Sequence, residues 1–303
     1  MKLLVSKWSG FYSVPDPYIR DRFVSQTHEL LETSFDLRQK LSSKFLKSVE
    51  RSQLARIVRA MKDSHLIEDE VLNVIDGGVF MGVFSIATNG IAQMLSLSAM
   101  IEAYEMSAML KESILANFSL HQCPVCLEMC GIGEHDSESA NLYFRDDGLI
   151  GASAIPSANV SSTTFAESSM KSLSSILKKG GIRTSNLIKL DLEGHEPNAF
   201  KSLLSTPELL RNIFIIEYSA WQGKRDFSSS QKSWAEFLCD NFYVFNLQNW
   251  ISSKPSIQVS HADGLLDDLE TGSKVWNTDI LLIPRQMEAM LDSYVSLNCP
   301  EIP

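Results

Sequence analysis

The sequence predicts an α/β protein built on a parallel, doubly wound sheet. Three observations favour this fold class: a buried apolar run that ends in a glycine-rich loop, a repeated alternation of apolar runs with segments of helical periodicity, and enough apolar residues for one large core. Of the 303 residues, 44% are hydrophobic and 21% are charged. This composition is typical of a folded globular chain and excludes disorder over its whole length.

The expected elements follow one another in a regular order. Residues 1–69 predict an N-terminal helical cap, with two or three helices between about 21 and 62. In residues 70–286, apolar runs alternate with helical spacing, which implies a parallel sheet with right-handed crossovers. The expected strands are 71–76, 97–104, 125–130, 186–191, 213–218, 242–247 and 279–284, and the expected helices are 81–94, 107–120, 170–179, 196–204 and 231–239. The polar stretch 131–169 predicts an insertion or lid, and residues 287–303 are expected to form a C-terminal tail.

The overall charge limits the partners of the chain. The formal net charge is −10, so phosphate backbones repel the protein unless it has a local basic patch. The basic residues of 38–59 are mixed with acids and serines, which is typical of a solvated helix face. We therefore expect no nucleic-acid partner.

The cysteines and the apolar segments indicate in which cellular compartment the protein is expected. The five cysteines, an odd number in a chain too long to need disulfide bridges, favour a reducing compartment, and the apolar run within 1–7 is too short for a signal peptide. The stretch between Asp76 and Glu102 has no charged residue and is long enough to span a bilayer. However, it contains several glycines and divides into a loop, a helix and a strand. We expect a cytoplasmic protein without a membrane span.

The first motif is the loop Asp76-x-Gly78-x-x-x-Gly82, which follows the buried run 71–76. Glycine allows a sharp turn and a close approach of a ligand to the backbone, and the next helix offers free N–H groups. A dinucleotide loop would have Gly-x-Gly-x-x-Gly around a pyrophosphate. Here the second place after Gly78 is not glycine, and an acid ends the strand. The loop predicts a ligand without phosphate but with a cationic amino group, as in the methionine half of S-adenosylmethionine. The alternative is a plain glycine turn.

The second motif is Glu105, directly after the second apolar run. An acid at the end of a second strand can accept hydrogen bonds from both ribose hydroxyls of an adenosine cofactor. The alternative is a surface glutamate near the start of the next helix. Together with the glycine loop, Glu105 predicts S-adenosylmethionine as the cofactor.

The third motif is KLDLEGHE at 189–196, which closes the fourth expected strand. Ligands in open α/β sheets lie beyond the carboxyl ends of the strands. Side chains alternate along a strand, so Asp191 and Glu193 share a side if the strand persists. The candidate catalytic residues are Asp191 and Glu193, followed by His195. Glu196 has a simpler explanation as an acid at a helix N-terminus.

These strings together resemble the FkbM-type methyltransferases, a branch of the class I S-adenosylmethionine-dependent enzymes. The resemblance covers residues 71–285, and its most specific part is the Lys-x-Asp-x-Glu-Gly-x-Glu pattern at 189–196. It also includes VIDGGVFMGVFS at 74–85, EAYE at 102–105, GIGE at 131–134 and DILLIP at 279–284.

The resemblance implies a Rossmann-like sheet of seven strands whose last strand is antiparallel. It implies cofactor contacts at Asp76, Gly78, Gly82 and Glu105, and we add Gly131 from the matching GIGE segment. It also implies methyl transfer to a hydroxyl oxygen, so the expected partner is a small-molecule or glycan acceptor. We expect in-line attack on the sulfonium methyl, with the protein supplying positioning and a base for the hydroxyl proton.

The chain departs from the family pattern at three places. Val79-Phe80 replaces the usual Ala-Asn, Met106 replaces a proline, and Leu173-Ser174 replaces a Leu-Asp pair. Two alternatives therefore stay open. One is a catalytically degenerate cofactor-binding protein of the same fold, and the other is a nicotinamide-dependent oxidoreductase, which the glycine spacing disfavours.

Other candidates have simpler explanations. Cys123 and Cys126 have a spacing found in metal and redox sites, but no second ligand pair at matching spacing accompanies them. We expect a core or edge role for them and no metal site. His261 and Trp221 lie in polar loops, where either an acceptor contact or a structural role is compatible with the sequence.

Overall fold

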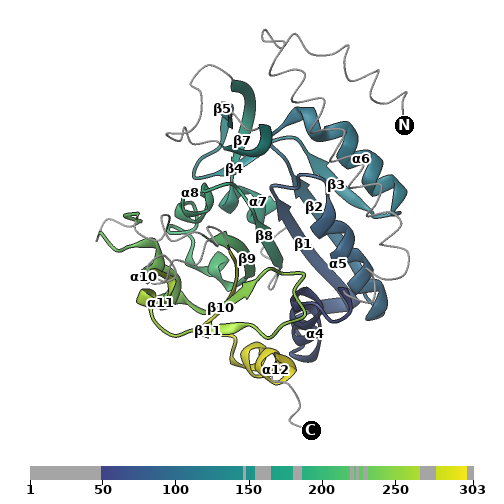
Figure 1. The fold of residues 1–303 in the computed structure, drawn as a ribbon, viewed down its shortest axis with the longest axis vertical. Helices are drawn as coiled ribbons and strands as arrows, with labels where there is room; N and C mark the ends of the chain where they lie inside the picture. The colour runs from purple at the N-terminus through teal and green to yellow at the C-terminus, as the bar shows by residue number, and fades with distance from the viewer. Residues whose placement is uncertain are drawn as a thin grey trace.

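The computed structural model describes residues 49–145, 148–153, 165–179, 186–218, 222, 225–227, 231–266 and 278–298. They form an open, mostly parallel sheet with helices on both faces, and a second, smaller sheet that lies beyond one end of it (Figure 1). The prediction of an α/β fold with a mostly parallel central sheet is confirmed.

Within the described residues, the main sheet has eight strands in the order β11-β10-β12-β9-β8-β1-β2-β3. Its strands are β1 (Val71–Gly77), β2 (Ser98–Tyr104), β3 (Val125–Glu128), β8 (Leu187–Leu190), β9 (Ile213–Tyr218), β10 (Phe242–Gln248), β11 (Ile257–Val259) and β12 (Thr278–Pro284). The strands from β9 to β3 pair in parallel, whereas β12 is antiparallel to both β9 and β10. The expected count is seven. The additional strand, β11, is a three-residue edge strand whose mostly exposed residues leave no hydrophobic pattern.

Helices cover the two faces of the main sheet as separate layers. The helices are α4 (Gln53–Asp63), α5 (Val83–Met94), α6 (Lys111–Leu120), α7 (Leu173–Lys179), α8 (Glu196–Lys201), α10 (Trp234–Asn241), α11 (Ala262–Leu266) and α12 (Glu288–Asn298). On β9, Ile213 and Ile215 pack in the core with α4, α5, α6 and α12, while Phe214 and Ile216 pack in the core with α7, α8, α10 and α11. Because both faces are covered, the strand is a continuous apolar run rather than an alternating one.

None of the helices in the described part of the chain is both long and apolar enough to cross a membrane. The uncharged stretch that follows Asp76 instead supplies the loop after β1, the helix α5 and most of β2.

The two ends of the described chain pack against each other. α4 and α12 lie side by side on one face of the main sheet (Figure 1). The Tyr294 hydroxyl of α12 donates to Gln53 Oε1 of α4 at 2.7 Å. The expected tail at 287–303 therefore includes a packed helix. Of the expected cap at 1–69, residues 1–48 lie outside the described residues, and α4 belongs to the core of the main sheet.

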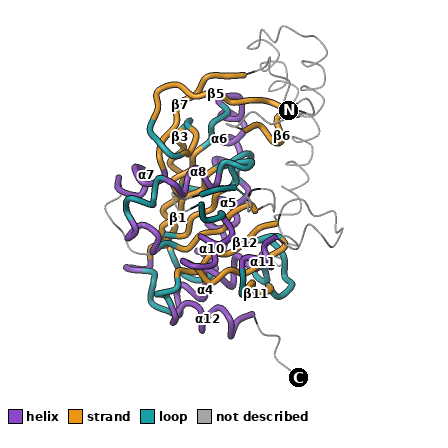
Figure 2. The backbone as a smooth tube through the Cα atoms, turned by 90° about the vertical axis from the view of Figure 1, so that its left-hand side faces the viewer, coloured by secondary structure: helices purple, strands orange, loops and turns teal. Residues whose placement is uncertain are grey.

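The stretch expected to be an insertion contributes most of the second sheet. Its order is β4-β7-β5-β6, with β4 (Gly131–Gly133), β5 (Ser137–Arg145), β6 (Gly148–Ser153) and β7 (Phe165–Ser172). Seen from the side, β5, β6 and β7 extend away from the main sheet (Figure 2). The helix expected from residue 170 begins only at Leu173, because the chain is still paired in β7. The Ser172 hydroxyl accepts the N–H of Ser175 and so caps the first turn of that helix.

Candidate functional site

Most of the predicted site residues lie at one edge of the main sheet, where the strand order reverses beside β1. β2 and β3 lie on one side of β1, and β8 and β9 lie on the other. Open α/β sheets bind ligands beyond the carboxyl ends of the strands at such a switch point. Gly78, Glu105 and Asp191 directly follow β1, β2 and β8, and the last residues of these strands pair with one another. The register therefore brings the glycine loop and two of the predicted acids together.

Gly78 and Gly82 shape the loop between β1 and α5. They have positive φ angles of 78° and 79°, a conformation that glycine adopts without strain. A Cβ on Gly78 would overlap the carbonyl oxygen of Asp191, and a Cβ on Gly82 would lie 2.5 Å from the ring of Phe118. Both glycines are thus required by the close packing of the loop as well as by the turn.

Phe80 in the same loop has a φ of 51° although it carries a large side chain. Asn tolerates this left-handed conformation better than Phe, for which the cost is on the order of 1 kcal/mol. The Phe80 N–H donates to Glu105 Oε2 at 2.9 Å, and Val79 is buried. Val79 and Phe80 therefore add apolar side chains to the loop, and the Phe80 backbone contacts Glu105.

Glu105 is almost fully buried after the end of β2. Besides the Phe80 N–H on Oε2, it accepts the Ser107 N–H on Oε1 at 2.8 Å. Burial raises the pKa of Glu105, these two hydrogen bonds lower it, and the charges of Asp76 and Asp191 raise it again. Each carboxylate oxygen has a second lone pair, so Glu105 can accept two further donors from a ligand.

Asp76 is 1% exposed at the carboxyl end of β1. Its Oδ2 accepts from the Ser85 hydroxyl at 2.6 Å, whereas its Oδ1 has no hydrogen-bond partner among the described residues. Burial raises the pKa of Asp76, while Lys189 and the Ser85 hydrogen bond lower it. A buried carboxylate oxygen without a donor is costly, and an ammonium or N–H group of a ligand would relieve that cost.

Lys189 is a buried cation at this edge. It is 4% exposed, and its Nζ donates to Asp191 Oδ2 at 2.7 Å. Burial alone would lower its pKa, but the charges of Asp191, Asp76 and Asp279 outweigh this effect and raise it. The ammonium group therefore fixes the position of the Asp191 carboxylate and partly neutralises the aspartates on β1 and β12.

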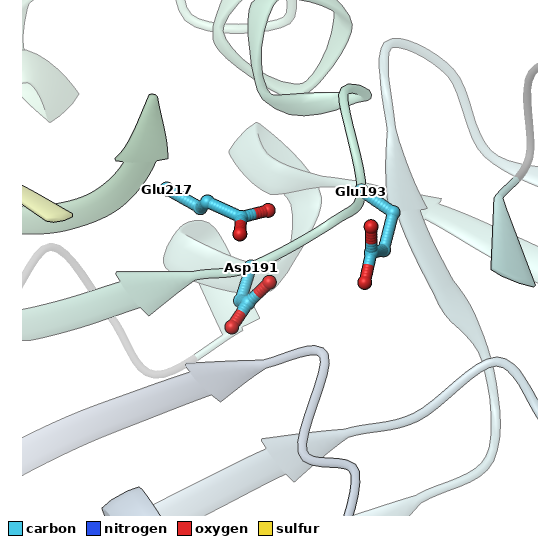
Figure 3. A group of neighbouring side chains, drawn as sticks. All are labelled: Asp191, Glu193 and Glu217. Carbon is cyan, nitrogen blue, oxygen red and sulfur yellow. The ribbon is translucent and has the colours of Figure 1, made fainter. Parts of the chain in front are cut away.

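Three carboxylates, those of Asp191, Glu193 and Glu217, lie around a common space beyond β8 and β9 (Figure 3). One oxygen of each lies within 4.8 Å of the other two. Glu193 and Gly194 have positive φ angles of 52° and 93°, so the chain turns sharply after Asp191 instead of continuing as a strand. The spacing would admit one cation between the three carboxylates, and it would equally admit a proton shared between two of them.

Glu217 is a site residue that the sequence analysis does not single out. The strand 213–218 is predicted, but its residues do not show that β9 lies next to β8. Burial raises the pKa of Glu217 to about 9, and the charges of Asp191 and Glu193 contribute to the rise. Glu217 therefore holds a proton at neutral pH and can donate a hydrogen bond.

Replacing Glu217 with glutamine is expected to stabilise the protein as the pH rises. The carboxyl ionises at a pKa of about 4.3 in an unfolded chain and at about 9 in the fold. Its contribution to stability is therefore fully present below about pH 4 and is lost progressively toward pH 9. Thermal unfolding should give equal midpoints for Glu217→Gln and wild type near pH 4. At pH 8 the midpoint of the variant should be about 10 °C higher, because this difference in pKa corresponds to about 5 kcal/mol. A difference that is the same at every pH would contradict this assignment.

His195 lies at the N-cap of α8. Burial lowers the pKa of His195 to about 4, and the charges of Arg225 and Lys201 lower it further. Its Nδ1 lies 3.2 Å from Asn198 Nδ2. A group with this pKa is a weak base at neutral pH, so nothing in its environment singles out His195 as the proton acceptor.

Gly131 and Glu196 have close structural contacts around them. Gly131 lies in β4, where a Cβ would be 3.0 Å from Met106 Sδ, so it packs against the loop after β2.

Glu196 is fully buried and accepts hydrogen bonds from the Leu192 N–H at 2.6 Å and from Gln222 Nε2 at 2.9 Å. Glu196 thus closes the turn between Asp191 and α8, whereas a cofactor contact at Gly131 stays a prediction.

The other candidates do not join the carboxylate group. Cys123 and Cys130 are buried in different cores of the main sheet, and Cys126 is exposed on β3. His261 is exposed at the start of α11. Trp221 lies outside the described residues.

The fold and the site together define an α/β protein with a polar, acid-rich carboxyl edge at the switch point of a mostly parallel sheet. No protein-family model matches the sequence, and no curated protein matches it. Among solved structures, the chain is similar to a protein from Listeria monocytogenes that is provisionally assigned to the class I S-adenosylmethionine-dependent methyltransferases. The identity is 9% and the TM-score is 0.34, over 77% of this chain and 59% of that protein. The chain thus spans about three fifths of the length of the Listeria protein.

Two further structures are similar at the same low level. Geranyl diphosphate methyltransferase in complex with S-adenosylmethionine has 10% identity and a TM-score of 0.30, over 75% of this chain and 84% of that one. A Burkholderia thailandensis protein, described as a methyltransferase candidate and bound to S-adenosyl-homocysteine, has 10% identity and a TM-score of 0.26, over 82% of this chain and 61% of that one. Similarities of this size establish neither a family nor a function for this chain.

Proposed function

We propose that this protein binds S-adenosylmethionine at the carboxyl ends of β1, β2 and β8, and transfers its methyl group to a hydroxyl of a sugar or other small metabolite. The observation that supports this most is the buried Asp76 Oδ1, which has no partner among the described residues, beside the glycine loop. A buried acceptor at Asp76 suits an ammonium group, and the carboxylate of Glu105 suits ribose hydroxyls. The residues present therefore fit both halves of this cofactor.

The cofactor-binding residues have separate tasks in this proposal. Glu105 accepts the ribose hydroxyls, and Asp76 accepts the ammonium group of the methionine half. Gly78 lets the ligand approach the bare backbone, and Gly82 begins the helix whose first N–H groups face the same loop. When bound, S-adenosylmethionine supplies an electrophilic sulfonium methyl.

The acceptor-binding residues lie one strand further on. Asp191 accepts the proton of the acceptor hydroxyl, and Lys189 fixes the position of its carboxylate by donating from Nζ to Oδ2 at 2.7 Å. Glu217 is protonated at neutral pH and donates a hydrogen bond to the acceptor, and Glu193 orients the hydroxyl between them. Since the sulfonium methyl is reactive by itself, positioning and proton acceptance are the main tasks of the protein.

We also propose that the chain belongs to the FkbM-type branch of the class I enzymes. The pattern at 189–196 supports this, because its lysine and its first two acids are among the residues that meet at the sheet edge. A cytoplasmic location and the lack of a nucleic-acid partner belong to the same proposal, and the net charge of −10 and the five cysteines support them.

The Val79-Phe80 pair favours one alternative, a cofactor-binding protein that has lost catalysis. Phe80 has a strained backbone and occupies one lone pair of the Glu105 carboxylate. Tight binding of S-adenosylhomocysteine without methyl transfer to any of several hydroxyl-bearing acceptor classes would favour this alternative.

Transfer of a labelled methyl group from S-adenosylmethionine to a panel of sugars and hydroxylated metabolites tests the proposed reaction. We expect transfer by wild type and a loss of about 100-fold or more in the Asp191→Asn, Glu193→Gln double variant, because a general base contributes about that much. S-adenosylhomocysteine binding should be retained in the double variant. Glu208→Gln, a change of an exposed acid in the 3₁₀-helix Pro207–Arg211, is the matched control and should leave transfer unchanged. Equal turnover by the double variant and wild type would exclude both acids as the base.

A further inference from the structure

We propose that the Ser107 hydroxyl contacts the adenosine half of the bound cofactor, next to Glu105. This inference rests on the proposed function, and the sequence analysis assigns no role to Ser107. It adds a hydrogen-bond donor to a part of the site whose other ligand-binding side chains, Glu105 and Asp76, are carboxylates.

Four buried side-chain polar atoms have no partner among the described residues: Asp76 Oδ1, Ser107 Oγ, Tyr218 Oη and Trp234 Nε1. Tyr218 and Trp234 belong to the aromatic core with α10, on one face of the main sheet. Asp76 and Ser107 instead lie at the end of β1 and just after β2, where a ligand would bind. An unsatisfied buried polar group in a folded protein requires an explanation, and a bound ligand provides one for this pair.

The Ser107 hydroxyl does not cap the helix that begins after it. Ser107 is 4% exposed and is the N-cap residue of the short 3₁₀-helix Ala108–Leu110. A serine at an N-cap ordinarily accepts a hydrogen bond from the first turn through its hydroxyl. Here the side chain makes no such bond, and only the Ser107 carbonyl closes the turn, by accepting the Leu110 N–H at 3.0 Å. The hydroxyl is therefore buried without serving the helix.

The backbone holds Ser107 beside the adenosine-binding acid. The Ser107 N–H donates to Glu105 Oε1 at 2.8 Å, so the serine cannot move without disturbing that carboxylate. An ionised carboxylate only accepts hydrogen bonds, whereas a hydroxyl both donates and accepts. Ribose hydroxyls and adenine ring nitrogens present both acceptors and donors. The Ser107 hydroxyl would therefore donate a hydrogen bond to an acceptor atom of the adenosine. The Glu105 carboxylate cannot do so because it only accepts hydrogen bonds.

The two unpartnered atoms at this edge differ in their chemistry, and this difference gives a test. Asp76 Oδ1 accepts only and suits the ammonium group of the methionine half. Ser107 suits the adenosine half. 5′-Methylthioadenosine contains the adenosine half without the amino acid, so it separates the two contacts.

The experiment is calorimetric titration of wild type, Ser107→Ala and Asp76→Asn with S-adenosylhomocysteine and with 5′-methylthioadenosine. We expect Ser107→Ala to weaken both ligands by the same factor, about five- to tenfold, which is the size of one neutral hydrogen bond. Asp76→Asn should weaken S-adenosylhomocysteine more than 5′-methylthioadenosine. A Ser107→Ala variant with wild-type affinity for both ligands, or with a loss only for S-adenosylhomocysteine, would overturn the inference.

The stability of the ligand-free protein supplies a second readout. Removing a hydroxyl that has no partner should leave the thermal midpoint of Ser107→Ala unchanged or raise it. The control is Ser202→Ala, because the buried Ser202 hydroxyl donates to the Ala199 carbonyl at 2.7 Å and accepts the Ser174 N–H at 3.1 Å. That change should lower the midpoint. A midpoint for Ser107→Ala lowered as much as that of the control would show that the hydroxyl serves the fold, and would overturn the inference.

Binding of S-adenosylhomocysteine by wild type distinguishes a failure of the proposed function from a failure of the role of Ser107. If wild type binds S-adenosylhomocysteine but Ser107→Ala does so equally well, only the role of Ser107 falls. If folded wild type does not bind S-adenosylhomocysteine, the proposed function falls and the inference falls with it.

Discussion

Replacing Gly78 with alanine is expected to lower the free energy of unfolding by about 2–5 kcal/mol and to abolish cofactor binding. The left-handed φ of 78° costs an L-residue about 1–2 kcal/mol. The added Cβ would also overlap the carbonyl oxygen of Asp191, which is backbone and has little room to move. Overpacking of this kind adds about 1–3 kcal/mol. Denaturant unfolding of Gly78→Ala and wild type measures the loss.

Gly264→Ala is the matched control for that experiment. Gly264 lies in α11, has no positive φ, and an added Cβ would meet only Val259 Cγ1 at 3.1 Å. Alanine is favoured over glycine in a helix interior by about 1 kcal/mol. Gly264→Ala should therefore be neutral or slightly stabilising. If Gly78→Ala proved as stable as Gly264→Ala, the loop would not have the tight packing described here.

Replacing Lys189 with methionine is expected to lower the free energy of unfolding by about 3–5 kcal/mol at pH 7. Removing one partner of a buried ion pair leaves the other charge uncompensated, which is more costly than losing an exposed pair. Lys189 is 4% exposed, donates to Asp191, and is near the carboxylates of Asp76 and Asp279. Methionine keeps the apolar length of the side chain, so the change isolates the charge. Denaturant unfolding at pH 7 gives the difference.

The pH dependence of that loss provides a further check. Burial raises the pKa of Asp279 to about 6 even in the presence of Lys189, and it also raises the pKa of Asp76. Without the ammonium group these pKa values rise further, so the carboxyls become neutral at a higher pH and no longer need the cation. The loss of unfolding free energy in Lys189→Met, relative to wild type, should therefore become smaller as the pH falls from 7 to 5. A loss that becomes larger on acidification would contradict the role of Lys189 in compensating these carboxylates.

Lys171→Met is the control for Lys189→Met. Lys171 pairs with Glu128, and about a third of each side chain is exposed. Solvent-exposed ion pairs contribute about 0–1 kcal/mol. If Lys171→Met lowered the free energy of unfolding as much as Lys189→Met does, burial of the ion pair would not explain the effect of Lys189→Met.

The sequence predicts the position of Gly78, Glu105 and Asp191 because each directly follows an apolar run that forms a strand of the main sheet. The carboxyl ends of adjacent parallel strands must meet at one edge of the sheet, so the residues that follow these runs come together. The glycine spacing also predicts the left-handed turn, since the φ angles of Gly78 and Gly82 require residues without a Cβ. These parts of the site follow from local chemistry and one topological rule.

Other parts depend on information that is not local. Glu217 enters the site because β9 pairs with β8, and no residue in 213–218 specifies that neighbour. The unsatisfied atoms of Asp76 and Ser107 are visible only when every surrounding donor and acceptor is known. Their role as candidate ligand contacts therefore emerges from the three-dimensional arrangement alone.

The second sheet and the edge strand β11 escape prediction for a related reason. Residues 165–172 are rich in serine and have no regular apolar alternation, so the pairing of β7 with β4 and β5 leaves little trace in the sequence. β11 has only three residues, which is too short for a periodic pattern. In both places the strand is defined by its partner rather than by its own residues.

Calorimetric titration of the folded wild-type protein with S-adenosylhomocysteine, and separately with NAD, tests the central claim most directly. The account predicts one binding site per chain for S-adenosylhomocysteine, a strong loss of that binding in Glu105→Ala, and no binding of NAD. Binding of NAD without binding of S-adenosylhomocysteine would contradict the account, as would a failure of the folded wild type to bind S-adenosylhomocysteine.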